Sequence, residues 1–220
     1  MAQLDQVLWI GGAQWAGKST VSIILAARYP VVRYAYDYHD ARSHSARART
    51  DPLRYPTFSA FLDALDSDPD SVWSDPSPEQ MAQQMVVIFQ ERFEMVLQDL
   101  AALPEESSVL AEGWGLRPDL IAPHIKSPNR TVFLVPSDAF RQRQLAALER
   151  AKAPGTLGLR DPERAQRNRV ARDGLLAADV VARATQLRLP IIEVDGQEDV
   201  QAVTARVEEG FRPYLPAWLY

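Results

Sequence analysis

The segment from Gly12 to Ser19 has the residue spacing in this chain that most directly indicates chemistry. Two glycines enclose four residues, and the second glycine is followed at once by Lys18 and Ser19. Glycines let neighbouring backbone N–H groups point at one anion, a lysine adds positive charge, and a hydroxyl can ligate Mg²⁺. The pattern predicts a phosphate-binding loop made of Gly12, Ala13, Gln14, Trp15, Ala16, Gly17, Lys18 and Ser19, with Thr20 directly behind them.

The sequence on both sides of this motif supplies the elements that would position it. Val7 to Ile10 is a short run of apolar residues that favour β-structure, which predicts a buried strand ending at the glycines. A helix is expected from about Lys18 to Arg28. The N-terminus of that helix would face the same space as the loop, where its dipole favours an anion.

The rest of the chain alternates between strand-like and helix-like patterns. Long helices are expected after Ser77 and Asp161, because each is a capping residue followed by proline. Behind Ser77, apolar residues recur at helical spacing and predict a buried face of Met81, Met85, Phe89, Phe93, Val96 and Leu100. Four more strands are expected at Val31 to Tyr36, Val109 to Ala111, Thr131 to Val135 and Ile191 to Val194. The alternation predicts an α/β fold, in which helices cover both faces of a five-stranded parallel sheet.

Two polar stretches interrupt this alternation. Residues 37–55 mix histidine, arginine and aspartate without a clear period, and residues 66–77 are acidic and contain proline. Both are predicted to be loops, the first of them functional. The length of 220 residues fits one globular domain, so residues 1–220 are expected to form a single unit.

The composition excludes several classes of protein and site. With no cysteine, the chain has no disulfide, thiolate zinc site or cysteine nucleophile, and its 3 histidines are scattered. The net charge of −5 means that the chain lacks the excess of positive charge typical of general nucleic-acid binders, so no nucleic-acid partner is expected. No apolar run approaches the roughly 18 residues of a membrane span, and the N-terminus lacks a signal-peptide pattern. We therefore expect a cytoplasmic protein without a membrane partner.

With its flanking strand and helix, the motif resembles the Walker A loop of the P-loop NTPase superfamily, and the resemblance covers nearly the whole chain. Neither Lys126 nor Lys152 lies in the guanine-binding motif of Ras-like GTPases, and the LSGGQ signature of ABC ATPases is missing. The third strand ends in Glu112-Gly113 rather than in the acidic pair of AAA+ ATPases. The chain thus resembles the nucleotide-kinase-like branch, which includes nucleoside monophosphate kinases, shikimate kinase and chloramphenicol phosphotransferase.

This resemblance implies roles for residues at the ends of strands. Asp37 follows the second strand, where these kinases face the acceptor, so it is expected to orient or deprotonate an attacking hydroxyl, with Asp40 as the fallback base. The alternative for Asp37 is capping of the following turn. Glu112 would hold Mg²⁺ together with Ser19, or would instead pair with an arginine.

The acceptor is expected to bind at a loop of about residues 37–56. His39, Arg42 and His44 are its expected contacts there, and Trp114 is expected either to close over the acceptor or to pack in the core. Further arginines of this segment would suit a carboxylate or a phosphate, unless they belong to a solvated loop: Arg47, Arg49 and Arg54.

Residues 153–172 resemble the lid of these kinases. A buried stripe of Leu176, Val180 and Leu187 would place Arg169 and Arg172 on the inward side of the last long helix, and Arg167 on the other. Inward arginines would stabilise the transferring phosphate, or pair with internal carboxylates such as Asp173. Residues 194–197 resemble the segment that borders adenine in this branch.

Together these features predict an ATP- and Mg²⁺-dependent kinase that phosphorylates a hydroxyl of a small molecule. In this interpretation Asp37 is the base, and Lys18, Arg169 and Arg172 stabilise charge on the transferred group. Two alternatives remain: a nucleoside monophosphate kinase, whose ionised acceptor needs no base, and a regulatory ATPase that acts through a protein partner. The sequence does not indicate the acceptor, the oligomeric state or a preference between ATP and GTP.

Overall fold

A parallel sheet organises the chain in the computed structural model, which describes residues 4–39, 43–147 and 158–217. Its five strands lie in the order β2-β3-β1-β4-β5, and each neighbouring pair is parallel. They are β1 (Leu8–Gly12), β2 (Val32–Ala35), β3 (Val109–Glu112), β4 (Thr131–Pro136) and β5 (Ile191–Val194). The phosphate-loop motif therefore leaves the central strand of the sheet, and the fold class predicted from the sequence is confirmed.

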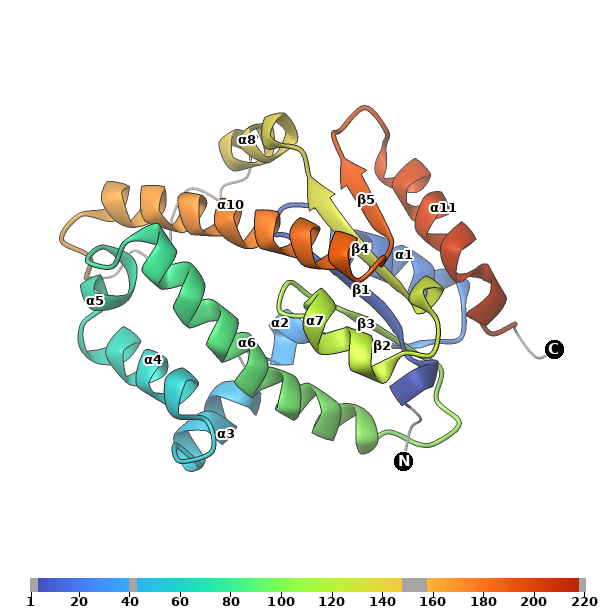
Figure 1. Ribbon diagram of the computed structural model, residues 1–220, viewed down its shortest axis with the longest axis horizontal. Coiled ribbons are helices and arrows are strands. Elements are labelled where there is room, and N and C mark those ends of the chain that lie inside the picture. Colours follow the sequence, from blue (N-terminus) through green and yellow to red (C-terminus); the bar gives the residue numbers. More distant parts are fainter. Residues whose placement is uncertain (1–3, 40–42, 148–157, 218–220) are drawn as a thin grey trace.

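Side chains of the central strand alternate between two apolar layers, as the two-residue period of a strand requires. Trp9 enters one layer, where its ring centroid lies 6.0 Å from that of Phe93. Leu8 and Ile10 enter the other layer. The first layer holds α6 (Pro78–Ala101) and α10 (Pro162–Gln186), and the second holds α1 (Lys18–Arg28) and α11 (Val200–Phe211), so helices cover both faces (Figure 1).

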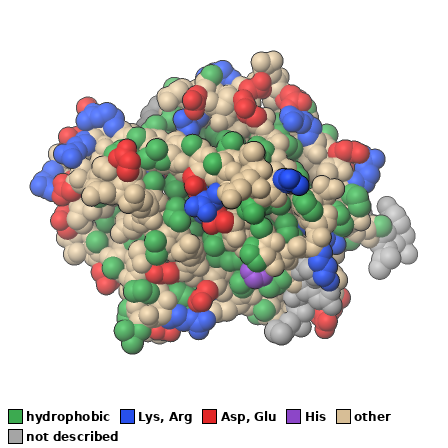
Figure 2. All heavy atoms as spheres, in the orientation of Figure 1, with side chains coloured by type: hydrophobic (Ala, Val, Ile, Leu, Met, Phe, Trp, Pro, Cys, Tyr) green, Lys and Arg blue, Asp and Glu red, His purple; other side chains and the backbone are tan. Residues whose placement is uncertain are grey.

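Six more α-helices lie within the described residues, of which α3, α4 and α5 lie together to one side of the sheet (Figure 1). They are α2 (Tyr36–His39), α3 (Ser45–Thr50), α4 (Pro56–Ser67), α5 (Asp70–Trp73), α7 (Pro118–Ile121) and α8 (Asp138–Ala147). The capping box predicted at Ser77 is present, and all six apolar residues expected on the inner face of α6 are buried. Acidic and basic side chains are interspersed around the edge of the face shown in Figure 2.

The structure corrects the sequence analysis in three places. The polar stretches 37–55 and 66–77 contain α2, α3, α5 and the end of α4 instead of being loops. Tyr36 belongs to α2 rather than to the second strand, so Asp37 lies in the first turn of a short helix. Leu187 is 40% exposed, because α10 ends at Gln186 and Leu187 is its C-cap.

Part of the expected lid, residues 153–157, lies outside the described residues, as do Asp40 and Arg42. Asp161 caps α10 as predicted, accepting a hydrogen bond from the backbone N–H of Arg164. Within the described ranges, no helix combines the length and the apolar character needed to cross a bilayer.

Candidate active site

The loop between β1 and α1 has the backbone geometry that its glycines allow. Gly12 has φ 120°, and a Cβ at this position would lie 2.1 Å from the carbonyl oxygen of Leu134. Gly17 has φ 81° and precedes the first residue of α1. Any other residue type would be strained at these two positions, since their positive φ is accessible mainly to glycine.

This loop lines a cavity of about 380 Å³, which we call the loop cavity. One side consists of the loop and the first turn of α1, residues 14–21, together with Asp37. The other side is formed around α8, β5 and α11 by Phe140, Gln144, Val194, Glu198, Val200 and Val203. Val194 belongs to the segment expected beside adenine, whereas Phe140 and Gln144 carried no recognisable motif in the sequence.

Lys18 is buried at the N-terminus of α1. Its Nζ donates a hydrogen bond to the carbonyl oxygen of Ala13 at 2.5 Å. Burial lowers the pKa of this ammonium group, while the negative charges of Asp37, Glu112 and Asp173 act in the opposite direction. Three carboxylates therefore surround the lysine expected to bind phosphate.

Ser19 and Glu112 meet beside the loop. The Ser19 hydroxyl donates a hydrogen bond to Glu112 Oε2 at 3.1 Å, and Arg33 donates to Glu112 Oε1 at 2.7 Å. The expected arginine partner of Glu112 is thus Arg33, yet one carboxylate oxygen still faces the serine. These two residues line a second cavity together with Asp37, which we call the metal cavity. A hydroxyl and a carboxylate oxygen at its wall fit Mg²⁺, which prefers oxygen ligands.

Asp37 also lines a third cavity, of about 440 Å³, which we call the acceptor cavity. Its polar wall contains Gln14, Asp37, Ser45, Arg92, Arg169 and Arg172. Its larger, apolar wall contains Phe58, Phe61, Leu62, Leu65, Trp73, Met85, Ile88 and Trp114. Among these apolar residues, the sequence analysis placed only Trp114 at the acceptor. The apolar spacing within α4 could have revealed an amphipathic helix, but not that its inner face borders a cavity.

Asp37 lines all three cavities, and Gln14 lines both the loop cavity and the acceptor cavity. The strand β2 and the short helix α2 place the Asp37 carboxylate at the carboxyl edge of a parallel sheet, where ligands of such folds bind. A group held in the acceptor cavity and one held in the loop cavity would meet beside this side chain.

The two inward arginines of α10 differ in their surroundings. Arg172 is buried and pairs with Asp173 at 2.7 Å, so the alternative expected for it is present. Within the described residues Arg169 makes no ion pair, and its guanidinium lies 5.6 Å from the ring centroid of Trp15 in the phosphate loop. Burial lowers its pKa, against the charge of Asp173. Arg167 is exposed, as predicted.

The arginines expected to attract an acidic acceptor are bound to carboxylates of the protein. Arg47 pairs with Asp99, and Arg54 pairs with Glu94 at 3.1 Å. Arg49 bridges Asp63 and Asp66 on α4. The structure therefore does not gather these three side chains at the acceptor cavity.

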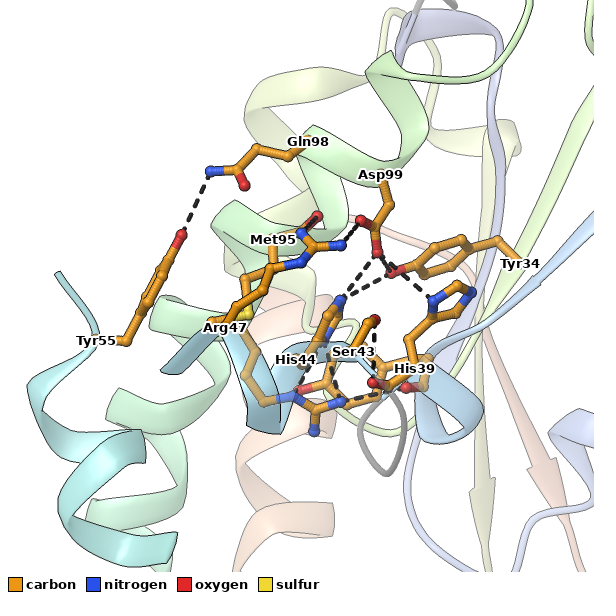
Figure 3. Close-up of polar contacts among 11 residues, drawn as sticks. Tyr34, His39, Ser43, His44, Arg47, Tyr55, Met95, Gln98 and Asp99 are labelled. Atoms are coloured by element: carbon orange, nitrogen blue, oxygen red, sulfur yellow. Dashed lines mark hydrogen bonds and ion pairs between the residues drawn. The ribbon is translucent and has the colours of Figure 1, made fainter. Parts of the chain in front are cut away.

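The two histidines expected as acceptor contacts lie around Asp99 of α6 (Figure 3). His44 is fully buried, and its Nε2 lies 3.0 Å from Asp99 Oδ2. The Tyr34 hydroxyl donates to the same oxygen at 2.8 Å, and the His39 ring stacks on the Tyr34 ring at 4.4 Å between centroids. His39 also lines the metal cavity.

This cluster is a structural clamp rather than a metal site. Its three candidate ligands, His39, His44 and Asp99, lie close enough together to hold an ion. However, Asp99 already accepts hydrogen bonds from Arg47 and Tyr34, and the Arg92 guanidinium faces His44 Nδ1 at 3.4 Å. Two nearby guanidinium groups oppose a cation, so the cluster instead ties α2 and α3 to α6.

The clamp predicts an acid-dependent loss of stability. Burial alone would raise the pKa of Asp99, but hydrogen bonds from His44, Arg47 and Tyr34 outweigh it and lower the pKa from 3.8 to about 2. A lowered carboxyl pKa stabilises the fold above the unfolded-state value, and this contribution is lost as the pH falls from about 4 to about 2. We expect about 2 kcal/mol of the unfolding free energy to depend on Asp99 in this window.

Urea unfolding between pH 2 and 7 measures this dependence. Asp99→Asn should have a lower unfolding free energy than wild type at neutral pH, and this difference should disappear as the pH falls below 4. The exposed control Asp68→Asn should follow the wild-type curve at every pH. Equal slopes for wild type and Asp99→Asn would contradict the role of the clamp.

Comparisons with known proteins found similar solved structures, but no family for this chain. No family model matches the sequence, and no curated protein matches it. A shikimate kinase structure from Bacteroides thetaiotaomicron has 16% identity and a TM-score of 0.49, covering 94% of this chain and 98% of that one. A shikimate kinase from Acinetobacter baumannii, solved with shikimate, has 14% identity and a TM-score of 0.45, covering 94% and 93%. The protein TT1252 from Thermus thermophilus has 17% identity and a TM-score of 0.44, covering 92% and 96%. We therefore base the function on this chain's own residues.

Proposed function

We propose that this protein is an ATP- and Mg²⁺-dependent kinase that transfers the γ-phosphoryl group to a hydroxyl of a small molecule. The observation that supports it best is the position of Asp37, which borders the loop cavity, the metal cavity and the acceptor cavity at once. A carboxylate at the meeting point of two substrates is suited to accept a proton during transfer.

The proposed reaction is an in-line displacement. The hydroxyl oxygen of the acceptor forms a bond to the γ-phosphorus, and the bond from that phosphorus to the β–γ bridging oxygen breaks. The hydroxyl proton passes to the Asp37 carboxylate, and ADP leaves with the electron pair of the broken bond. Because such a transition state is loose and spread over the phosphoryl oxygens, the protein contributes mainly position and charge.

The positive charge that stabilises the transferring phosphate would come from the phosphate loop and from α10. Lys18 and the backbone N–H groups of residues 14–18 would hold the phosphates, and Arg169 would reach the transferring group from α10. Ser19 and Glu112 would hold Mg²⁺, which neutralises phosphate oxygens when bound. Arg172 is paired with Asp173, so we propose that it shapes the acceptor cavity rather than contacting phosphate.

The Asp37 carboxylate at the acceptor cavity favours a hydroxyl over an ionised phosphate, because an ionised acceptor has no proton to lose. A nucleoside monophosphate brings about two negative charges and is commonly held by bidentate arginines. The arginines that the sequence suggested for such an acceptor, Arg47, Arg49 and Arg54, are paired with protein carboxylates away from this cavity. The arginines that line it are Arg92, Arg169 and Arg172, of which Arg172 is paired with Asp173. A regulatory ATPase would need no acceptor cavity beside its phosphate loop.

The test is consumption of Mg·ATP by the purified chain against a panel of alcohols, sugars, nucleosides, nucleoside monophosphates and aminoglycosides. ADP release is followed, and the product is identified by ³¹P NMR. We expect at least one hydroxyl compound to accelerate turnover and to become a phosphate monoester. Acceleration by nucleoside monophosphates alone would overturn the proposal, as would ATP hydrolysis that no acceptor stimulates.

A further inference from the structure

Arg33 and Glu112 form an ion pair at the wall of the metal cavity. The Glu112 side chain is only 2% exposed, and the Arg33 guanidinium donates to its Oε1 at 2.7 Å. The other carboxylate oxygen, Oε2, accepts a hydrogen bond from the Ser19 hydroxyl at 3.1 Å. Each oxygen of Glu112 therefore has its own partner, and only Oε2 contacts the residue proposed to hold Mg²⁺ with it.

A closed ring of hydrogen bonds fixes the position of Arg33. Its Nε donates to the Ser22 hydroxyl at 2.8 Å, and that hydroxyl donates to the backbone carbonyl oxygen of Ser19 at 2.9 Å. The ring returns to Ser19 through Glu112, so it connects β2, β3 and α1. Because a guanidinium is a rigid planar fork, the bond at Nε also fixes the nitrogen that holds Glu112. The carboxylate is thus kept in one orientation.

The register of the sheet leaves room for this contact. Ala35 lies opposite Glu112 on the neighbouring strand, and Arg33 lies opposite Leu110. Arg33 and Ala35 are two residues apart on β2, so their side chains share one face of the sheet. Because alanine is short, the long arginine side chain can reach past it to Glu112. The pairing of β2 with β3 therefore builds the ion pair into the fold.

The charges along the metal cavity still favour a cation. Among the described residues that line it, Asp37 and Glu112 supply two carboxylates against the one guanidinium of Arg33. Burial lowers the pKa of His39, which keeps this side chain of the wall uncharged at neutral pH. The clamp around Asp99 differs, because two guanidinium groups lie there beside a single carboxylate.

Mg²⁺ and Ca²⁺ make different demands on a carboxylate. Ca²⁺ takes six to eight oxygen ligands and often binds both oxygens of one carboxylate. Mg²⁺ is smaller, requires nearly octahedral geometry and keeps several water molecules, so one oxygen of a carboxylate serves it well. A carboxylate whose second oxygen is held by a guanidinium cannot bind an ion through both oxygens. Such an arrangement costs Ca²⁺ more than Mg²⁺.

We propose that Arg33 is a positioning residue that makes the site at Ser19 and Glu112 selective for Mg²⁺ over Ca²⁺. By occupying Oε1 of Glu112, it leaves the ion one carboxylate oxygen. This inference rests on the Mg²⁺ site of the proposed function and adds the residue that sets the choice of ion. Arg33 acts through Glu112, since it lines neither the loop cavity nor the acceptor cavity.

Binding of the non-hydrolysable ATP analogue AMP-PNP to the full chain measures this choice without turnover. Calorimetric titrations in EDTA, in excess Mg²⁺ and in excess Ca²⁺ give three Kd values for each variant. Wild type should bind the analogue more tightly with Mg²⁺ than with Ca²⁺. Arg33→Met should shift the ratio of these two Kd values toward Ca²⁺ by about tenfold or more, the usual size of effect for a residue that orients a metal ligand.

The ratio separates the orientation of Glu112 from the loss of a positive charge. The two ions carry the same charge, so the missing guanidinium charge alone strengthens both alike, whereas a free Oε1 favours Ca²⁺. Arg33→Gln is the second variant should Arg33→Met fail to fold. An unchanged ratio in a folded Arg33 variant would overturn the inference, as would equal strengthening by the two ions in wild type. If neither ion strengthens binding in wild type, the cation site itself is absent and the inference falls.

Two further variants are the controls. Arg28 pairs with Glu208 at 2.6 Å and lines none of the three cavities, so Arg28→Met removes the same charge from another arginine–glutamate pair and should keep the wild-type ratio. In a Glu112→Gln background, Arg33→Met should leave the ratio unchanged, because Arg33 acts through that carboxylate. A full shift in either control would contradict the role assigned to Arg33.

The acceptor panel separates this inference from the proposed function. Phosphorylation of an acceptor, together with an unchanged ion ratio in Arg33→Met, would remove the role of Arg33 and leave the kinase proposal standing. A shifted ratio without phosphorylation of any acceptor would support the role of Arg33 and overturn the kinase proposal.

Discussion

Replacing Asp37 with asparagine is expected to lower turnover with a hydroxyl acceptor by about 10² to 10⁴, the usual range for loss of a general base. The amide keeps the size of the carboxylate but cannot take the proton that the acceptor must lose. Because asparagine also keeps most of the hydrogen-bonding capacity of the side chain, affinity for ATP should change little. The measurement is steady-state kinetics at saturating Mg·ATP with the acceptor found in the panel.

Asp68→Asn is the matched control, since Asp68 is exposed and lines none of the three cavities, and the variant should support wild-type turnover. Near-normal turnover of Asp37→Asn would remove Asp37 as the base. A loss seen mainly as weaker acceptor binding would favour an acceptor that is already ionised. The two outcomes separate in the kcat and KM values.

Replacing Lys18 with alanine is expected to reduce phosphoryl transfer by about 10² to 10³, or roughly 3 to 4 kcal/mol, because the ammonium group stabilises charge on the transferring phosphate. Affinity for Mg·ATP should fall as well. In this structure the Lys18 ammonium also spans the loop to the Ala13 carbonyl and lies among three carboxylates. The variant therefore needs a thermal unfolding measurement beside the kinetics.

The chain has two other lysines, which makes a close control possible. Lys126 is exposed beyond α7, and Lys126→Ala should retain both activity and stability. A folded Lys18→Ala protein with the turnover of this control would show that residues 12–19 do not hold the phosphates of ATP.

Sequence patterns predicted the framework because the interactions behind them are local. The strand–loop–helix unit around Gly12 and Lys18 depends on a few adjacent residues, namely an apolar run, glycines that adopt positive φ and a helix N-terminus. The start of α6 depends on Ser77 and the residues next to it. The alternation of such units was enough to predict a parallel sheet, with Asp37 and Glu112 at the edge where ligands bind.

The polar stretch after Asp37 shows where local reasoning fails. Its histidines and arginines look like a ligand-binding loop in the sequence, but α3 turns Arg47 and His44 toward Asp99 on α6. Asp99 lies 52 residues beyond Arg47, and no property of either neighbourhood indicates the pairing. The same holds for Arg33, whose partner Glu112 is 79 residues away.

The sequence by itself determined that this protein has a glycine-containing loop before a helix, a parallel α/β core and a carboxylate at the carboxyl edge of the sheet, since each depends on short-range spacing. Only the tertiary structure decided what lies opposite that edge. The wall brings Leu65, Trp73 and Met85 of the consecutive helices α4, α5 and α6 together with Trp114 after β3, and Arg172 of α10 is neutralised there by Asp173. Burial and charge compensation are properties of the packed chain, so the chemistry of the acceptor cavity could be inferred only after the helices were in place.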